Sequence, residues 1–127
     1  MMRFVLICLG GAVGTGARYL LTGWIAKLLG SAFPYGTLTV NVVGSFLIAL
    51  VMTLAMEAAL ISPTTRLALT TGVMGGFTTY SAFAYESLTR LQHKAWFEAA
   101  LYMGLTLGAC LVACLLGVLL ARQWLNG

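Results

Sequence analysis

The stretch GVMGGFTTYSAFAYE spans residues 72–86 and lies inside an apolar segment that is long enough to cross a lipid bilayer. It carries a glycine pair, two threonines, a serine and a glutamate, which a plain spanning helix does not require. Each glycine lowers helix propensity by about 1 kcal/mol, and the hydroxyls of Thr78 and Thr79 compete for backbone hydrogen bonds. A helix break at membrane depth is tolerated only where the backbone is buried or lines a cavity. The stretch therefore predicts a helix broken near residues 75–79, at the working part of the protein.

The composition of the whole chain indicates an all-α integral membrane protein. Of its 127 residues 61% are hydrophobic and 8% are charged, whereas soluble domains average about 25% charged residues. About 20 helical residues cross the hydrocarbon core, and four segments reach that length, at about 4–29, 35–56, 67–88 and 95–121. We expect a single membrane domain over residues 1–127. Little chain remains outside the spans, which argues against a soluble enzyme or a nucleic-acid binder.

The sequence offers no constellation for catalysis or for a Cys/His metal site. Cys8, Cys110 and Cys114 all lie within predicted spans, with no histidine nearby. We interpret them as small apolar packing residues. No nucleophile and base are paired in a recognisable motif, so we expect that the protein is not an enzyme.

The charges of the loops are balanced between the two sides of the predicted bundle. Positive residues in flanking loops normally set the orientation of a membrane protein. Here one side carries Arg3, Arg66 and Arg122, and the other carries Lys27, Arg90 and Lys94. A tie of this kind favours dual topology, in which copies insert both ways and pair as an antiparallel homodimer.

Three glycine pairs at a spacing of four residues offer close contacts between helices. We expect one or two of these pairs to serve as such contacts. They are Gly10 with Gly14, Gly72 with Gly76, and Gly104 with Gly108.

Two polar residues lie well inside the first two spans. Arg18 either snorkels to the nearer membrane surface, helped by Tyr19 and Trp24, or lines a wet vestibule as a fixed positive charge. Asn41 lies between Thr37 and Ser45 on one helix face, at a spacing of four residues. This stripe either holds helices together or lines a water path.

Three motifs together resemble the small bacterial fluoride channels, the Fluc or CrcB family. They are Gly-Ala-Arg at 16–18, GTLTVNVVGSF at 36–46 and GGFTTYSAF at 75–83. The resemblance covers essentially the whole chain. It implies an antiparallel dual-topology homodimer in the bacterial inner membrane, with two pores that export fluoride passively. The implied partners are fluoride, the lipid bilayer and a second copy of the chain.

The resemblance also implies roles for individual residues. Asn41 would bind fluoride at one end of each pore, and the rings of Tyr80 and Phe83 would form a box that the ion passes. An aromatic ring has a positive edge, so it can solvate a small anion. Arg18 would lie near the vestibule, and the backbone carbonyls of Gly75 and Thr78 would hold a structural Na⁺. A polar track would contain Ser81, Thr37, Thr106 and Glu86.

The chain departs from the family pattern at three positions. Tyr80 stands where the family usually has phenylalanine, and Ala82 and Ala84 replace the usual threonine and serine. Two alternatives remain. A small multidrug-type transporter would need a carboxylate in the first span, which this chain lacks. A non-transporting membrane subunit would tolerate changes at Asn41 or Phe83.

Overall fold

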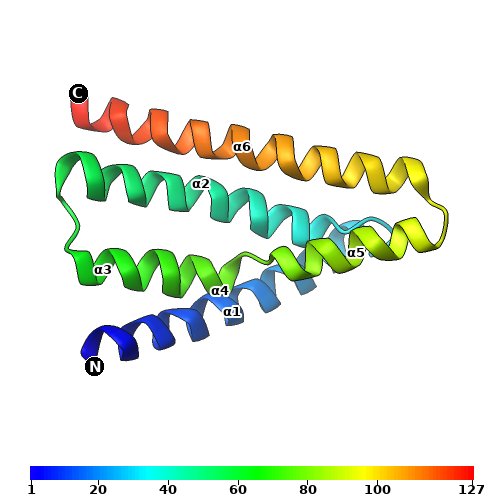
Figure 1. Ribbon diagram of the computed structural model, residues 1–127, viewed down its shortest axis with the longest axis horizontal. Coiled ribbons are helices and arrows are strands. Elements are labelled where there is room, and N and C mark those ends of the chain that lie inside the picture. Colours follow the sequence, from blue (N-terminus) through cyan, green and yellow to red (C-terminus); the bar gives the residue numbers. More distant parts are fainter.

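The computed structural model describes all 127 residues, and every regular element in it is helical (Figure 1). Three helices are long and apolar enough to cross a membrane. They are α1 (Met2–Leu29), α2 (Tyr35–Ala58) and α6 (Trp96–Asn126). Their bounds agree with the predicted first, second and fourth spans to within about five residues, because long apolar runs between short polar loops are a strong local signal.

The segment between α2 and α6 is a helix in several pieces. It consists of α3 (Pro63–Leu67), the π-helical segment η1 (Ala68–Met74), α4 (Gly75–Phe77) and α5 (Tyr80–Gln92). The predicted break is present, but it lies at Thr78 and Thr79, whose ψ angles of 160° and 107° are extended. Gly75 and Gly76 remain helical. No residue pattern had predicted the π-helical segment η1.

Threonine hydroxyls explain why the break occurs at this point. The Thr78 hydroxyl donates to the carbonyl of Met74, the last residue of η1, at 2.8 Å and so turns back along α4. The Thr79 side chain accepts a hydrogen bond from the amide of Ala82 at 3.2 Å and thereby caps the start of α5. A threonine in the N-cap position stabilises a helix start. One threonine therefore completes α4 and the next begins α5.

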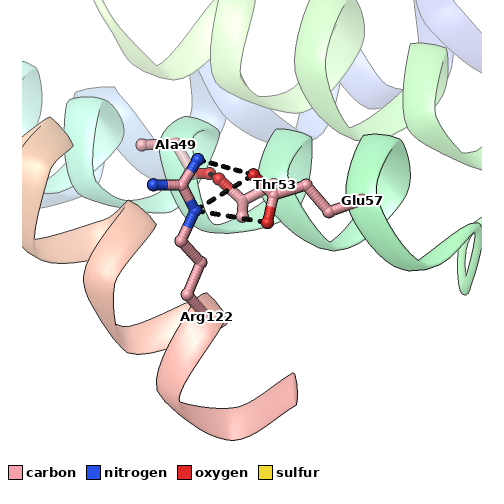
Figure 2. Close-up of polar contacts among 4 residues, drawn as sticks. All are labelled: Ala49, Thr53, Glu57 and Arg122. Atoms are coloured by element: carbon pink, nitrogen blue, oxygen red, sulfur yellow. Dashed lines mark hydrogen bonds and ion pairs between the residues drawn. The ribbon is translucent and has the colours of Figure 1, made fainter. Parts of the chain in front are cut away.

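The helices are arranged so that α2 lies beside α6 while α1 packs against η1 and α4. Both termini and the connection between α2 and α3 lie at one end of the molecule, and the other two connections lie at the opposite end (Figure 1). At the terminal end Arg122 binds Glu57, with a shortest N–O distance of 2.7 Å, and joins α6 to α2 (Figure 2). One turn earlier on α2, the Thr53 hydroxyl donates to the carbonyl of Ala49 at 2.8 Å.

Two of the three glycine pairs are close helix contacts, as predicted. A Cβ atom on Gly10 would lie 2.7 Å from the Ala68 carbonyl oxygen, and one on Gly72 would lie 2.8 Å from that of Ile7. One on Gly14 or Gly76 would meet the backbone of the facing helix. The pair on α6, Gly104 and Gly108, has no neighbour within 4 Å. The first two pairs thus hold α1 against the broken segment at backbone distance.

Candidate functional site

The break between α4 and α5 is held by the side chain of Asn41 on α2. Its Nδ2 donates to the carbonyl of Thr79 at 3.1 Å, and its Oδ1 accepts from the amide of Thr79 at 2.8 Å. One amide side chain therefore satisfies both backbone groups of a residue that has left the helix. Such groups cost several kcal/mol each if they are unsatisfied in a membrane.

This arrangement removes the regular hydrogen-bond donors of two backbone carbonyls. In a continuous helix the Gly75 carbonyl would accept from the amide of Thr79, which here binds Asn41. The Thr78 carbonyl would accept from the amide of Ala82, which here binds the Thr79 hydroxyl. Gly75 and Thr78 are the two residues predicted to hold a cation through their carbonyls. The break therefore leaves these oxygens without the amide partners of a regular helix.

Arg18 has a contact that neither sequence-based alternative included. Its Nε donates to the carbonyl of Gly76 at 2.9 Å, and the side chain is half-buried. The guanidinium thus caps the end of α4, where the carbonyls of a helix favour a positive charge. It does so across a long sequence separation, which no local pattern could predict.

A groove of about 590 Å³ runs beside the break and is lined by residues of α2, η1, α4, α5 and α6 and by Thr78 at the break itself. Six residues that the sequence analysis selected line it, together with Ser45 of the predicted stripe. No charged side chain lines the groove. The six residues are Asn41, Gly75, Thr78, Tyr80, Phe83 and Thr106.

The two aromatic residues after the break lie at the groove and contact each other. The ring centroids of Tyr80 and Phe83 are 5.8 Å apart, with a tilt of 60° between the planes. Tyr80 is 81% exposed, although it is a large aromatic residue. Phe83 is half-buried and also packs against Tyr102, with centroids 5.2 Å apart. Tyr80 therefore lies on the outer surface of the protomer, and Phe83 lies between the groove and the core.

The remaining predicted residues do not line the groove. Thr37 donates to a carboxylate oxygen of Glu86 at 2.7 Å, which links α2 to α5. Ser81 is exposed and lies 3.4 Å from the hydroxyl of Thr79. The predicted stripe on α2 is consequently divided, since Asn41 and Ser45 line the groove while Thr37 binds Glu86.

A second polar row lies on α6, and the sequence-based prediction included only Thr106 of it. Tyr102 is fully buried, and its hydroxyl and that of Thr106 have no hydrogen-bond partner. Cys110, which we interpreted as a packing residue, lines the groove. The three residues follow one another at a spacing of four, as Thr37, Asn41 and Ser45 do on α2. A search for polar residues at this spacing within α6 would have found them.

The arrangement can provide a neutral path for a small anion. Hydroxyl and amide hydrogens and the positive edges of aromatic rings face negative charge favourably. A groove without carboxylates does not repel an anion, and one without lysine or arginine does not trap it.

Comparison with known proteins identifies a family along almost the whole chain. The family model described as "CrcB-like protein, Camphor Resistance (CrcB)" matches residues 5–118. A protein of Sorangium cellulosum named "Fluoride-specific ion channel FluC" is 48% identical over 127 residues, which cover both chains completely. A protein of the same name from Anaeromyxobacter sp. is 50% identical over the same length. Another, from Geobacter metallireducens, is 45% identical over 97% of this chain and 99% of its own. These names describe ion channels and not enzymes.

Proposed function

The chain belongs to the CrcB-like protein family, and on that premise we propose that it is a passive, fluoride-selective ion channel of the bacterial inner membrane. The observation that carries the proposal is the full-length identity of about one half to relatives named as fluoride-specific channels. The groove supports it, because it offers hydrogen-bond donors and ring edges without a fixed charge. Nothing in the chain couples flow to an energy source, so fluoride moves down its own gradient.

Fluoride passes along the groove by binding to successive polar groups and ring edges. Asn41 binds the ion at one end through its amide group, which also holds the break. The ring edges of Phe83 and Tyr80 replace part of the water that the ion gives up. The hydroxyl of Thr106, which has no partner within the protomer, donates to the ion further along. Ser81, Thr37 and Glu86 complete a polar track beside these groups.

The working unit is an antiparallel homodimer with four crossings per protomer and two pores. The segment α3–α5 forms the fourth crossing, in two halves on either side of the break. Two features of the protomer support the dimer: Tyr80 is 81% exposed, and the groove is not enclosed by one chain. The three-against-three balance of positive charges supports insertion in both orientations.

The backbone carbonyls of Gly75 and Thr78 from both copies would hold a structural Na⁺ at the centre of the dimer. Support comes from the loss of the regular amide partners of these two oxygens, described above. Freed carbonyls at a helix break are typical ligands of Na⁺ in membrane proteins. Bound Na⁺ would supply a positive charge that balances these carbonyl dipoles. Arg18 binds the intervening Gly76 carbonyl, which leaves the other two for the cation.

Growth in fluoride tests the proposal directly. A bacterium that lacks its own fluoride exporter should grow in millimolar fluoride when it expresses this chain. Phe83→Ile should abolish that growth, because it removes the ring edge at the groove. The control is Leu107→Ile, an apolar change at another residue that lines the groove, and it should retain growth. Failure of the wild-type chain to restore growth, despite membrane insertion, would contradict the proposal, and equal growth with Phe83→Ile would contradict the role of the ring.

A further inference from the structure

Arg90 lies in the last turn of α5. It is next to Tyr102, the first residue of the polar row on α6. Its Nη1 donates to the carbonyl of Glu86 at 3.0 Å, and its Nη2 donates to the carbonyl of Ala32 at 3.1 Å. Its side chain is only 14% exposed. The guanidinium is thus fixed between α5 and the connection that joins α1 to α2.

Aromatic rings connect this guanidinium to the groove. Its Cζ lies 5.6 Å from the ring centroid of Tyr102 and 5.9 Å from that of Phe33. Tyr102 in turn packs against Phe83, which lines the groove. Arg90 is therefore one aromatic ring away from the proposed fluoride path.

The positive charge of Arg90 is only partly compensated within the protomer. The nearest recorded carboxylate oxygen belongs to Glu98, at 3.8 Å from Nε, which is too far for a hydrogen bond. The carboxylate of Glu86 accepts a hydrogen bond from Thr37 instead. The Nε of Arg90 is buried and has no hydrogen-bond partner. A guanidinium stays charged under all ordinary conditions, and a buried charge acts over a longer distance than an exposed one.

The unpaired donors form a series that leads from the groove toward Arg90. Three buried side-chain atoms of the protein have no partner, and each can donate a hydrogen bond. They are Thr106 Oγ1, Tyr102 Oη and Arg90 Nε.

We propose that Arg90 attracts fluoride to the part of the groove beside Phe83 and raises the local anion concentration there. This inference rests on the proposed function, since it assumes that fluoride uses the groove. The alternative is that Arg90 only joins α5 to the connection at Ala32 through its two carbonyl contacts. The effect of the Arg90 charge can be separated from the effect of its two carbonyl contacts. A lysine at this position keeps the charge but cannot make both contacts in the geometry of a guanidinium.

The test measures fluoride efflux from liposomes for Arg90→Lys and Arg90→Gln, over a range of fluoride concentrations and at low and high ionic strength. Flux is expressed per folded protein, as judged by size-exclusion chromatography. We expect Arg90→Gln to reduce flux at low fluoride by about tenfold, as for the loss of an electrostatic focusing charge, and to reduce it less at saturating fluoride. Arg90→Lys should stay within about twofold of wild type. The ionic-strength dependence of flux should weaken only in Arg90→Gln.

The matched control is Lys27→Gln, which removes an exposed positive charge at the same end that does not lie over the rings of Phe33 and Tyr102. It should leave the flux within about twofold of wild type, since an exposed charge is screened by salt. Equal losses in Arg90→Lys and Arg90→Gln, with unchanged salt dependence, would overturn the inference and leave the fluoride channel intact. A wild-type protein that carries no fluoride would overturn both.

Discussion

Asn41 on α2 binds both backbone groups of Thr79 and so holds the helix break with a single side chain. The sequence indicated that an amide at this depth needs a partner, because hydrocarbon offers none. It could not identify the partner, since Thr79 lies 38 residues further along the chain. The same holds for Arg18 and Gly76, which are 58 residues apart. Residue types at membrane depth were therefore predictable, while their long-range partners depended on how the helices pack.

Asn41→Asp tests whether the two hydrogen bonds from Asn41 to Thr79 hold the helix break, and it hardly changes the shape of the side chain. The substitution replaces the Nδ2 donor by an oxygen, which then faces the carbonyl oxygen of Thr79. We expect a loss of stability of about 1–3 kcal/mol, the usual effect of leaving a buried group unsatisfied. The loss would appear as a lower unfolding temperature in detergent. Ser45→Ala, one turn along the same groove, should unfold close to wild type, and an unchanged unfolding temperature in Asn41→Asp would show that the clamp does not hold the break.

At the scale of elements, the broken segment between α2 and α6 was only partly predictable. The threonine pair allowed the break to be predicted, because a threonine hydroxyl competes for backbone hydrogen bonds and favours the N-cap of a new helix. The break lies at Thr78 and Thr79, within the predicted residues 75–79, whereas Gly75 and Gly76 stay helical and serve another purpose. Gly76 is needed as a flat surface against α1, where a Cβ would meet the Gly11 carbonyl and would lie 2.9 Å from Thr15 Oγ1. Close packing, rather than flexibility, therefore explains this glycine.

Gly76→Ala should separate α1 from α4. The new methyl group would meet the backbone of α1, which cannot rotate away as a side chain could. We expect a net loss of about 1–3 kcal/mol in stability from overpacking, measured by thermal unfolding in detergent. The matched control is Gly23→Ala on α1, whose Cβ would have no neighbour within 4 Å. It should be neutral or stabilise by up to about 1 kcal/mol through helix propensity, and similar effects of the two substitutions would contradict the packing described here.

At the scale of the whole molecule, the sequence predicted a helical membrane protein well, because its apolar runs and short loops are local features. Arg3 and Arg122, which were predicted to lie on the same side of the bundle, both lie at the terminal end. Arg3 binds Thr64 there, and Arg122 binds Glu57. The groove on the outer surface could not be predicted, since it depends on how α2, η1, α4, α5 and α6 pack. The pairing of two copies stays a prediction of the charge balance.

Two lysines appended after Gly127 would break the balance of three positive charges against three. The added charges should keep the terminal end on the cytoplasmic side, so that oppositely inserted partners become scarce. We expect one-sided insertion, shown by labelling of a cysteine at one end, and a lower yield of active dimer. Two appended glutamines serve as the control and should change neither. Full activity with one-sided insertion would contradict the antiparallel arrangement.

Selective conduction of fluoride by this chain can be measured as efflux from liposomes reconstituted with the purified protein. Liposomes loaded with fluoride or with chloride would be followed with the corresponding ion-selective electrode. We predict rapid fluoride loss without chloride loss, with Tyr80 tolerated in place of the usual phenylalanine. No fluoride loss from a well-folded dimer, or equal loss of both anions, would contradict the claim.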